Sequence, residues 1–404
     1  MYIKRAIEEQ IKSASERCPV ILLSGLSDTG LTAMLKRMAG EDRTYVSLSD
    51  PRERFYAVTN PEVFLQRHQP PVLIDEIQYA PELLPRIKVC TENNPEQMGA
   101  FWLADSYDSD LSEQVTAIFG RRAASFHLGG LSNAEIRGIP NIPFTPTLDW
   151  LLQREQDARP QDVHRLYERI FRGSMPAMWE RGNTDRGEYY EKYIERFFRQ
   201  LGTHINGDPA RFYRFMVIAA ARTANTVRYS NIALEAEISP ITAKRWLSIL
   251  EAYGIIAIVK SFSSEGLGRG TAQMPLIHFL DSGLCAYLLK WNSAGDLERG
   301  DISGQIFKSY VYSEILKSYH NAGRNPEISY YRDKNKRQID LMIQTDGKLY
   351  PVIVSQGTEP SYSMLHTLEY MRETRAVEAA AVVSLTPEIA SIGENTWCIP
   401  AWML

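Results

Sequence analysis

A short apolar segment that runs into a glycine-containing loop constrains this chain most. Val20-Ile21-Leu22-Leu23-Ser24 leads directly into Gly25-Leu26-Ser27-Asp28-Thr29-Gly30-Leu31-Thr32. These residues follow the phosphate-loop pattern G-x-x-x-x-G-K-[ST], except that Leu31 stands where the pattern requires lysine. A strand, a glycine loop and a helix in this order direct backbone N–H groups and a positive helix end at a phosphate.

A second segment carries the carboxylates that such a site needs. Val72-Leu73-Ile74 is apolar and ends in Asp75 and Glu76. A strand of this kind places Mg²⁺ and a general base beside a bound triphosphate. The pattern predicts a nucleotide site at which Asp75 and Glu76 supply the carboxylates and Thr32 could bind Mg²⁺. The backbone of that site would come from Gly25 and Gly30.

The missing lysine weakens this expected site. Loss of one charge-assisted hydrogen bond costs about 1.5–3 kcal/mol, and Asp28 adds a negative charge inside the loop. Lys36 follows about one helical turn later and is expected to point away from the loop. We therefore expect ATP and Mg²⁺ to bind weakly, and the loop alone leaves open whether ATP is hydrolysed.

Length, charge and cysteine content limit the number of domains and the kinds of partner and compartment that are expected. A length of 404 residues allows two or three domains, and a net charge of -4 gives no global attraction to nucleic acid. The four cysteines are scattered without metal-site spacing, which favours reduced thiols in a cytoplasm. Because no apolar run approaches the ~20 residues that span a bilayer, we expect no membrane association.

Hydrophobic patterns divide the chain into four parts. Residues 1–135 alternate short apolar strands with helices, which predicts a parallel sheet covered on both faces. The expected strands are 20–24, 44–48, 71–75, 100–104 and 124–128. Residues 136–210 are predicted to be a helical lid region, and 211–262 a helix-turn-helix followed by a strand. The remainder, 263–404, mixes helices with strands, and Asp346-Gly347 indicates a hairpin.

Several further segments match one known family. They are residues 45–51 (YVSLSDP), 74–84 (IDEIQYAPELL), 120–121 (GR), 131–135 (LSNAE), 242–247 (TAKRWL) and 279–284 (FLDSGL). On these segments the chain resembles prokaryotic AAA-type ATPases that join a P-loop core to a winged helix and a C-terminal restriction-endonuclease-like domain. The resemblance runs from about residue 20 to residue 360. It implies an α/β fold with those domains in that order.

The resemblance also assigns roles and shows departures. It implies that Asp75 binds magnesium, that Glu76 is the catalytic base, and that Arg121 reaches a phosphate, in one reading across a subunit interface. Ser106 occupies a position suited to sensing the γ-phosphate. The family's loop resembles G-P-R-Q-V-G-K-T-T, of which this chain keeps only Gly25, Gly30 and Thr32.

The helix-turn-helix admits two interpretations. Lys244 and Arg245 could face a DNA backbone, while Trp246 and its apolar neighbours would form the inner side of the helix. The expected wing, residues 266–273, keeps one basic side chain, so any DNA binding should be weak and salt-sensitive. Packing of the winged helix against the core or a neighbouring molecule is the other interpretation.

The C-terminal region also lacks residues that a nuclease site of the family would need. The resemblance places metal ligands in E-I-D and P-I-E-I-K, where this chain has Gln338-Ile339-Asp340 and, at the second glutamate and the lysine, Ile353 and Ser355. Asp340 and Glu314 remain as vestigial ligands, and Lys308 replaces a helical acid. Without the second carboxylate and the lysine, nuclease activity is not expected.

Three functions are therefore open. The leading hypothesis is a catalytically degenerate ATPase-family protein, a pseudoenzyme that acts as a scaffold or regulatory partner of another protein or as a homo-oligomer. The second is a slow Mg-ATP-dependent ATPase. The third is a DNA-binding module that uses the winged helix.

Overall fold

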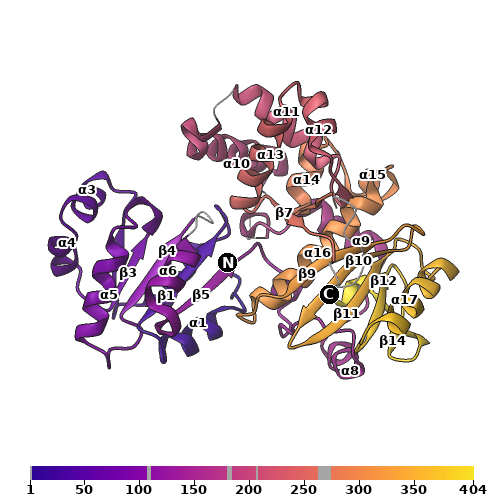
Figure 1. The fold of residues 1–404 in the computed structure, drawn as a ribbon, viewed down its shortest axis with the longest axis horizontal. Coiled ribbons are helices and arrows are strands. Elements are labelled where there is room, and N and C mark those ends of the chain that lie inside the picture. The colour runs from indigo at the N-terminus through magenta and orange to yellow at the C-terminus, as the bar shows by residue number, and fades with distance from the viewer. Residues whose placement is uncertain (1, 107–110, 180–183, 206–207, 263–273) are drawn as a thin grey trace.

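Three packed regions follow one another along the chain (Figure 1). The computed structural model describes residues 2–106, 111–179, 184–205, 208–262 and 274–404. The N-terminal region is an α/β layer structure, a mainly helical region follows, and a second sheet closes the chain. The expected α/β class is confirmed.

The N-terminal sheet has five parallel strands in the order β2-β3-β4-β1-β5. Its strands are β1 (Val20–Gly25), β2 (Thr44–Ser47), β3 (Val72–Asp75), β4 (Phe101–Asp105) and β5 (Ala123–Leu128). All five expected strands are present within one or two residues. Because the strands are parallel, their carboxyl ends share one edge, which brings Gly25 and Asp75 to the same side of the sheet.

Side chains that alternate along the strands of this sheet form one hydrophobic core on each of its faces. Val20 and Leu22 pack on one face against α3 (Pro51–Thr59), α4 (Pro61–Arg67), α5 (Leu83–Asn93) and α6 (Leu111–Phe119). Ile21 and Leu23 pack on the other against α1 (Glu8–Ser15) and α2 (Leu31–Ala39). Successive side chains of a strand point to opposite faces, so a strand with aliphatic residues at every position needs helices on both sides.

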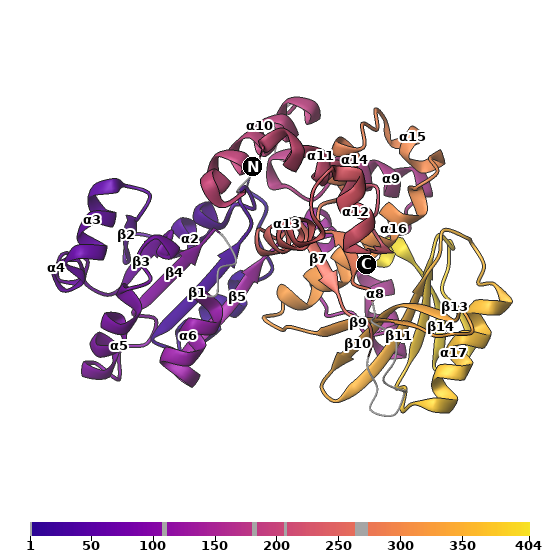
Figure 2. The same ribbon diagram turned by 45° about the horizontal axis from the view of Figure 1, so that its top comes forward.

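The helical region continues from this domain. It contains α7 (Asn133–Arg137), α8 (Leu148–Asp157), α9 (Val163–Arg172), α10 (Arg186–Leu201), α11 (Pro209–Ala220), α12 (Tyr229–Ala236) and α13 (Pro240–Ala252). Ser239 caps α13 by accepting a bond from the Thr242 amide, with Pro240 at the first helical position. Three helices, α11, α12 and α13, therefore lie where the sequence predicts them between residues 211 and 262 (Figure 2).

A small antiparallel sheet follows those helices. Its order is β6 (Asn225–Thr226), β8 (Leu276–Phe279), β7 (Ile256–Val259). Strand β8 pairs with β7 along four residues, although it lies beyond the boundary at 262 that the sequence suggests. The expected wing at 266–273 lies outside the described residues. Helices α14 (Ser282–Leu288) and α15 (Ala294–Arg299) come next.

The C-terminal sheet has six strands in the order β13-β14-β12-β11-β10-β9. They are β9 (Glu327–Arg332), β10 (Gln338–Thr345), β11 (Lys348–Val354), β12 (Ala380–Ser384), β13 (Ala390–Gly393) and β14 (Thr396–Pro400). The hairpin between β10 and β11 turns at Asp346 and Gly347, both with positive φ (52° and 74°), as the sequence predicts. Helix α17 (Tyr362–Thr374) packs on this sheet.

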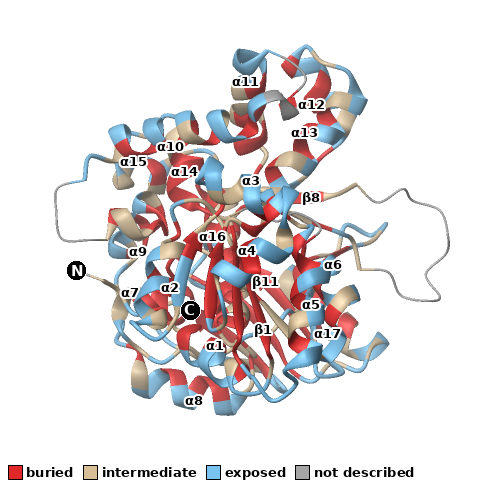
Figure 3. Cartoon of the chain, turned by 90° about the vertical axis from the view of Figure 1, so that its left-hand side faces the viewer, coloured by how far each residue is buried: buried red, intermediate tan, exposed pale blue. Residues whose placement is uncertain are grey.

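One long helix joins the regions. Helix α16 (Ser303–His320) is buried along most of its length and belongs to a core that also contains residues of α11, α12 and α13 and of the C-terminal sheet. Figure 3 shows buried residues concentrated along this helix and the sheets. The helical and C-terminal regions therefore share a continuous apolar core.

Candidate functional site

The glycine loop is a tight turn at the carboxyl end of β1. Gly30 has φ +81°, a left-handed conformation that favours glycine, and caps α2. A Cβ added at Gly25 would lie 3.2 Å from the carbonyl oxygen of Leu128, so glycine also permits close contact with β5. The Leu26 carbonyl accepts bonds from the Thr29 amide (3.2 Å) and the Thr29 hydroxyl (2.7 Å).

The two expected magnesium ligands, Thr32 and Asp75, are in direct contact. The Thr32 hydroxyl donates to Oδ2 of Asp75 at 3.0 Å, and the Tyr45 hydroxyl donates to the same oxygen at 2.9 Å. Burial, reinforced by the charge of Asp75, raises the pKa of Tyr45 to about 12. Thr32 and Asp75 are the residues that could hold Mg²⁺, since both offer oxygen atoms at the strand edge.

The expected base and γ-phosphate sensor also lie together. The Ser106 hydroxyl donates to Oε1 of Glu76 at 2.7 Å, and Gln78 Nε2 donates to Oε2 at 2.5 Å. Glu76 itself has φ +61°, an uncommon conformation for a residue with a side chain. These contacts fix both carboxylate oxygens, which is what a base beside a nucleotide would need.

Leu31 does not line the loop opening. Its side chain is 4% exposed and belongs to the core cluster beneath α2, with Met34 and Leu35. Lys36, the next cation along the helix, lies over the Tyr45 ring, with Nζ 3.7 Å from the ring centroid. Lys36 therefore contacts the ring of the tyrosine whose hydroxyl donates to Asp75.

A cation does reach the loop, but from a distant element. Arg196 of α10 forms an ion pair with Asp28, and the Tyr189 hydroxyl lies 3.5 Å from the same carboxylate. The Ser27 hydroxyl donates to Gln200 Oε1 at 3.0 Å. The negative charge of Asp28, which the sequence suggests would repel a phosphate, is thus compensated by Arg196. Spacing in the sequence gives no signal for this contact, because 168 positions separate the partners.

A buried arginine, Arg5, forms hydrogen bonds with the backbone of the glycine loop and of the segment after β5. Arg5 is 2% exposed and donates to the carbonyl oxygens of Thr29, Gly129 and Gly130 and to Oε1 of Glu135. Burial alone would raise the pKa of Glu135, but the Arg5 charge and bonds from the Ser132 and Ala6 amides hold it below its ordinary value. The conformation of the loop is therefore fixed by structural contacts on two sides.

Arg121 lies at the other edge of the sheet. It precedes Ala123, which pairs with Val20 at the start of β1, whereas Gly25 at the end of β1 pairs with Leu128. The side chain is exposed. The length of a strand separates Arg121 from the loop of its own chain, so only a second molecule could present this arginine to the loop.

The two vestigial carboxylates of the C-terminal region are not brought together. Asp340 accepts bonds from Lys308 Nζ (2.6 Å) and the Val354 amide (2.8 Å). Glu314 instead accepts bonds from Lys317 Nζ (2.5 Å) and the Asn133 amide (2.7 Å). Among the described residues no group of three or more His, Cys, Asp or Glu side chains could hold a metal ion.

The helix expected to read DNA exposes its basic residues. Lys244 and Arg245 are exposed on α13, and Trp246, Leu247 and Leu250 are buried beneath them. The carboxyl end of this helix approaches the loop, because a Cβ at Gly254 would collide with the Leu26 side chain. These contacts leave both interpretations of α13 open.

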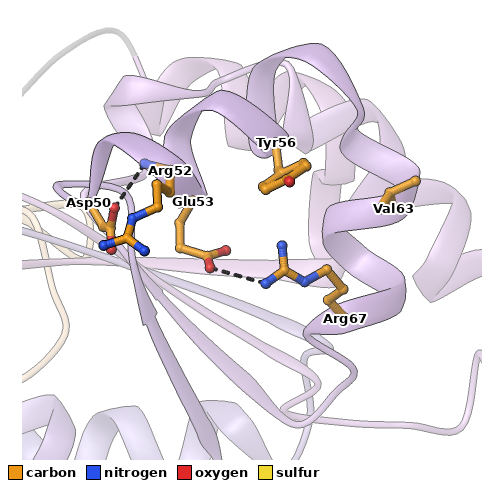
Figure 4. Close-up of a pocket in the computed structure, with 6 residues that line it drawn as sticks. All are labelled: Asp50, Arg52, Glu53, Tyr56, Val63 and Arg67. Atoms are coloured by element: carbon orange, nitrogen blue, oxygen red, sulfur yellow. Dashed lines mark hydrogen bonds and ion pairs between the residues drawn. The ribbon is translucent and has the colours of Figure 1, made fainter.

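A hollow between α3 and α4 lies outside this site. It has a volume of about 580 Å³ and is lined by Asp50, Arg52, Glu53, Tyr56, Val63 and Arg67 (Figure 4). Arg67 pairs with Glu53, and Asp50 caps α3 by accepting the Arg52 amide. These contacts are local to the two helices.

The comparisons with known proteins agree with the N-terminal geometry. Residues 17–137 match the family model of the AAA domain, 163–295 match a domain of unknown function (DUF8612), and 303–404 match another (DUF4143). The N-terminal domain, with its parallel sheet, glycine loop and Asp75-Glu76 strand end, is therefore an AAA-like P-loop domain. A search of curated proteins finds no match.

Solved structures include distant similarities. A Walker-type ATPase of Pyrococcus abyssi is 14% identical, covering 70% of this chain and 94% of that chain, with a TM-score of 0.43. A RuvB variant of Thermotoga maritima is 15% identical, covering 62% and 88%, with a TM-score of 0.32. A STAND protein with a tetratricopeptide repeat sensor from Pyrococcus horikoshii is 11% identical, covering 80% and 47%, with a TM-score of 0.26.

Across the described ranges, every helix is too short or too polar to cross a bilayer.

Proposed function

We propose that this protein is a catalytically degenerate AAA-type ATPase-family member that acts as a scaffold or regulatory partner. The single observation that carries the proposal is that the glycine loop binds the helical region of the same chain. Asp28 is paired with Arg196 of the helical region, and Leu31 is buried in the core below. A loop engaged in this way holds two regions of the chain together and offers no lysine to a phosphate.

The remaining domains would serve the same role. We assign a winged helix to α11–α13 with β7 and β8, and a restriction-endonuclease-like fold to the C-terminal sheet, in which Lys308 neutralises Asp340. The apolar core that both regions share supports a rigid body suited to binding a partner protein or a second copy. In a homo-oligomer, Arg121 would lie at the interface, because it is exposed at the sheet edge opposite its own loop.

Calorimetry with Mg-ATP tests the proposal directly. We expect no heat of binding from the wild-type protein, and clear micromolar binding would overturn the degenerate assignment. The variant Leu31→Lys is also expected not to bind, because its side chain replaces a buried leucine and the Asp28–Arg196 pair remains. The matched variant Leu31→Met keeps the apolar contact and controls for changes in folding.

The alternative, a slow Mg-ATP-dependent ATPase, is favoured by a specific pair of contacts. Thr32 still meets Asp75, and Ser106 still meets Glu76. If this alternative holds, slow release of phosphate will be measurable and Glu76→Gln will abolish it. Phosphate release that is equal in the wild type and Glu76→Gln would come from a contaminant and would count against the alternative.

A further inference from the structure

A hollow in the C-terminal region lies where α16, the β9–β10 loop, β11 and the start of α17 meet. Its volume is about 640 Å³. Three cationic side chains line it, Lys308, Lys336 and Arg337. Asp340 pairs with Lys308, and Asp333 beside the hollow pairs with Arg337, so positive charges exceed negative ones by one. The hollow therefore has an excess of positive charge, although the whole chain carries a net charge of -4.

An ammonium group stands beside the carboxylate at the base of this hollow. Lys308 Nζ lies 2.6 Å from Oδ1 of Asp340, whose other oxygen accepts the Val354 amide. A lysine ammonium has three N–H donors, and Asp340 engages one of them. Ile353, also in the lining, supplies no ligand oxygen. The arrangement suits an anion better than a cation, because a metal ion would have to displace Lys308.

The loop that carries the other cations is held in one conformation. Oδ1 of Asp333 accepts the amides of Asn335 (2.9 Å) and Arg337 (3.0 Å), and Oδ2 accepts Arg337 Nε (2.7 Å). Lys336 sits in this turn with φ +65° and is exposed at the rim. Since the turn is already ordered, an anion that binds Lys336 has little backbone entropy to overcome.

Aromatic rings also line the hollow. Tyr362 is 82% exposed, and its ring centroid lies 6.3 Å from that of His366 on the next turn of α17. Both residues line the hollow. Cationic side chains beside exposed aromatic rings are the combination by which proteins hold single-stranded nucleic acid, through phosphate contacts and base stacking.

We propose that this hollow binds a phosphate group without a metal ion, through Lys308 and Lys336. Two sources present such a group, a small phosphate compound or the backbone of a single nucleic-acid strand. The exposed Tyr362–His366 pair favours the strand. This binding would be independent of the glycine loop, which lies in the N-terminal domain.

The test uses the full chain in EDTA, with fluorescence anisotropy of a dye-labelled oligothymidylate and calorimetry with pyrophosphate. Lys336→Glu should weaken binding by roughly tenfold, because it replaces a phosphate-neutralising charge by a repelling one. Lys88→Glu, a reversal at an exposed lysine of α5, is the matched control and should have a much smaller effect. Tyr362→Ala should lower the affinity for the oligonucleotide and leave the affinity for pyrophosphate unchanged.

Asp340→Asn gives a test of opposite sign. It removes the carboxylate that competes for Lys308, so anion binding should become tighter, whereas a metal-dependent site would lose its ligand and weaken. Tight pyrophosphate binding without oligonucleotide binding would identify a small phosphate as the ligand. The proposal is overturned if neither probe binds, if binding requires Mg²⁺, or if Lys336→Glu and Lys88→Glu behave alike.

Discussion

Arg196 and Asp28 form an ion pair that ties the glycine loop to a helix 168 positions away in the sequence. The pair places a positive charge next to the loop that lacks its lysine. That charge is paired with a carboxylate of the loop, so it stabilises the contact between two regions (Figure 2). The predictions below separate structural roles of this kind from binding roles.

Removing the ion pair should loosen the loop locally. Both side chains are partly exposed, so Arg196→Ala should change global stability by less than about 1 kcal/mol. Amide hydrogen exchange in residues 26–30 should nevertheless become faster, because Asp28 loses its anchor to α10. Hydrogen exchange with mass spectrometry measures this. Arg199→Ala, an exposed arginine on the same helix, should leave that exchange unchanged; equal effects would contradict a specific role for Arg196.

Arg5 should be far more important for stability than its neighbour. Arg5→Ala leaves the buried Glu135 carboxylate without its charged partner and removes a donor from three backbone carbonyls, and breaking a buried pair costs about 3–5 kcal/mol. Lys4→Ala removes an exposed pair with Glu9 and should cost less than about 1 kcal/mol. Denaturant unfolding of both variants checks the difference. Similar midpoints would show that the Arg5 contacts contribute little.

Acid should destabilise the fold through two buried histidines. Burial lowers the pKa of His278 and of His320 to about 3, with smaller contributions from the charges of Lys308 and His127. The unfolded chain takes up these protons below pH about 6.5, whereas the folded chain does not. Stability should therefore fall as the pH drops from about 6.5 towards about 3, by up to about 1.4 kcal/mol per pH unit for each histidine.

Urea unfolding at several pH values within that window measures the effect. His320→Asn should reduce the slope of stability against pH, because one group no longer differs in proton uptake between the two states. An unaltered slope in His320→Asn would show that His320 takes up its proton in the folded chain.

Any DNA binding by the winged helix should depend on α13. Lys244→Ala combined with Arg245→Ala removes two exposed basic side chains. If both contact phosphates, affinity in gel shifts should fall and the dependence on salt should decrease by about two counterions. The double variant binding DNA like the wild type would exclude α13 as the contact surface. The Lys336→Glu variant distinguishes this surface from the hollow beside α17.

Local signals account for most of what could be predicted. Four aliphatic residues before Gly25 identify β1, Ser239-Pro240 marks the start of α13, and Asp346-Gly347 marks the C-terminal hairpin. Such features depend on a few adjacent residues, so the sequence contains them in full. The meeting of Thr32 with Asp75 also follows, because parallel strands end at one edge.

Strands of the C-terminal sheet show where local signals stop. Strands β12, β13 and β14 are absent from the sequence prediction, and they form through pairing with β11 and with one another. Their short segments carry no turn signal as clear as Asp346-Gly347. Non-local pairing of this kind is decided by the surrounding structure more than by propensity.

The order of the elements and the residues missing from two sites can be read from the amino-acid sequence. The ion pairs at these two places became known from the folded chain: Arg196 pairs with Asp28, and Lys308 pairs with Asp340. Folding also separates Glu314 from Asp340, which the sequence analysis grouped together. The sequence does not reveal these pairs because their partners lie far apart along the chain. Charge pairing acts between atoms a few ångströms apart, and folding alone determines which distant side chains come that close.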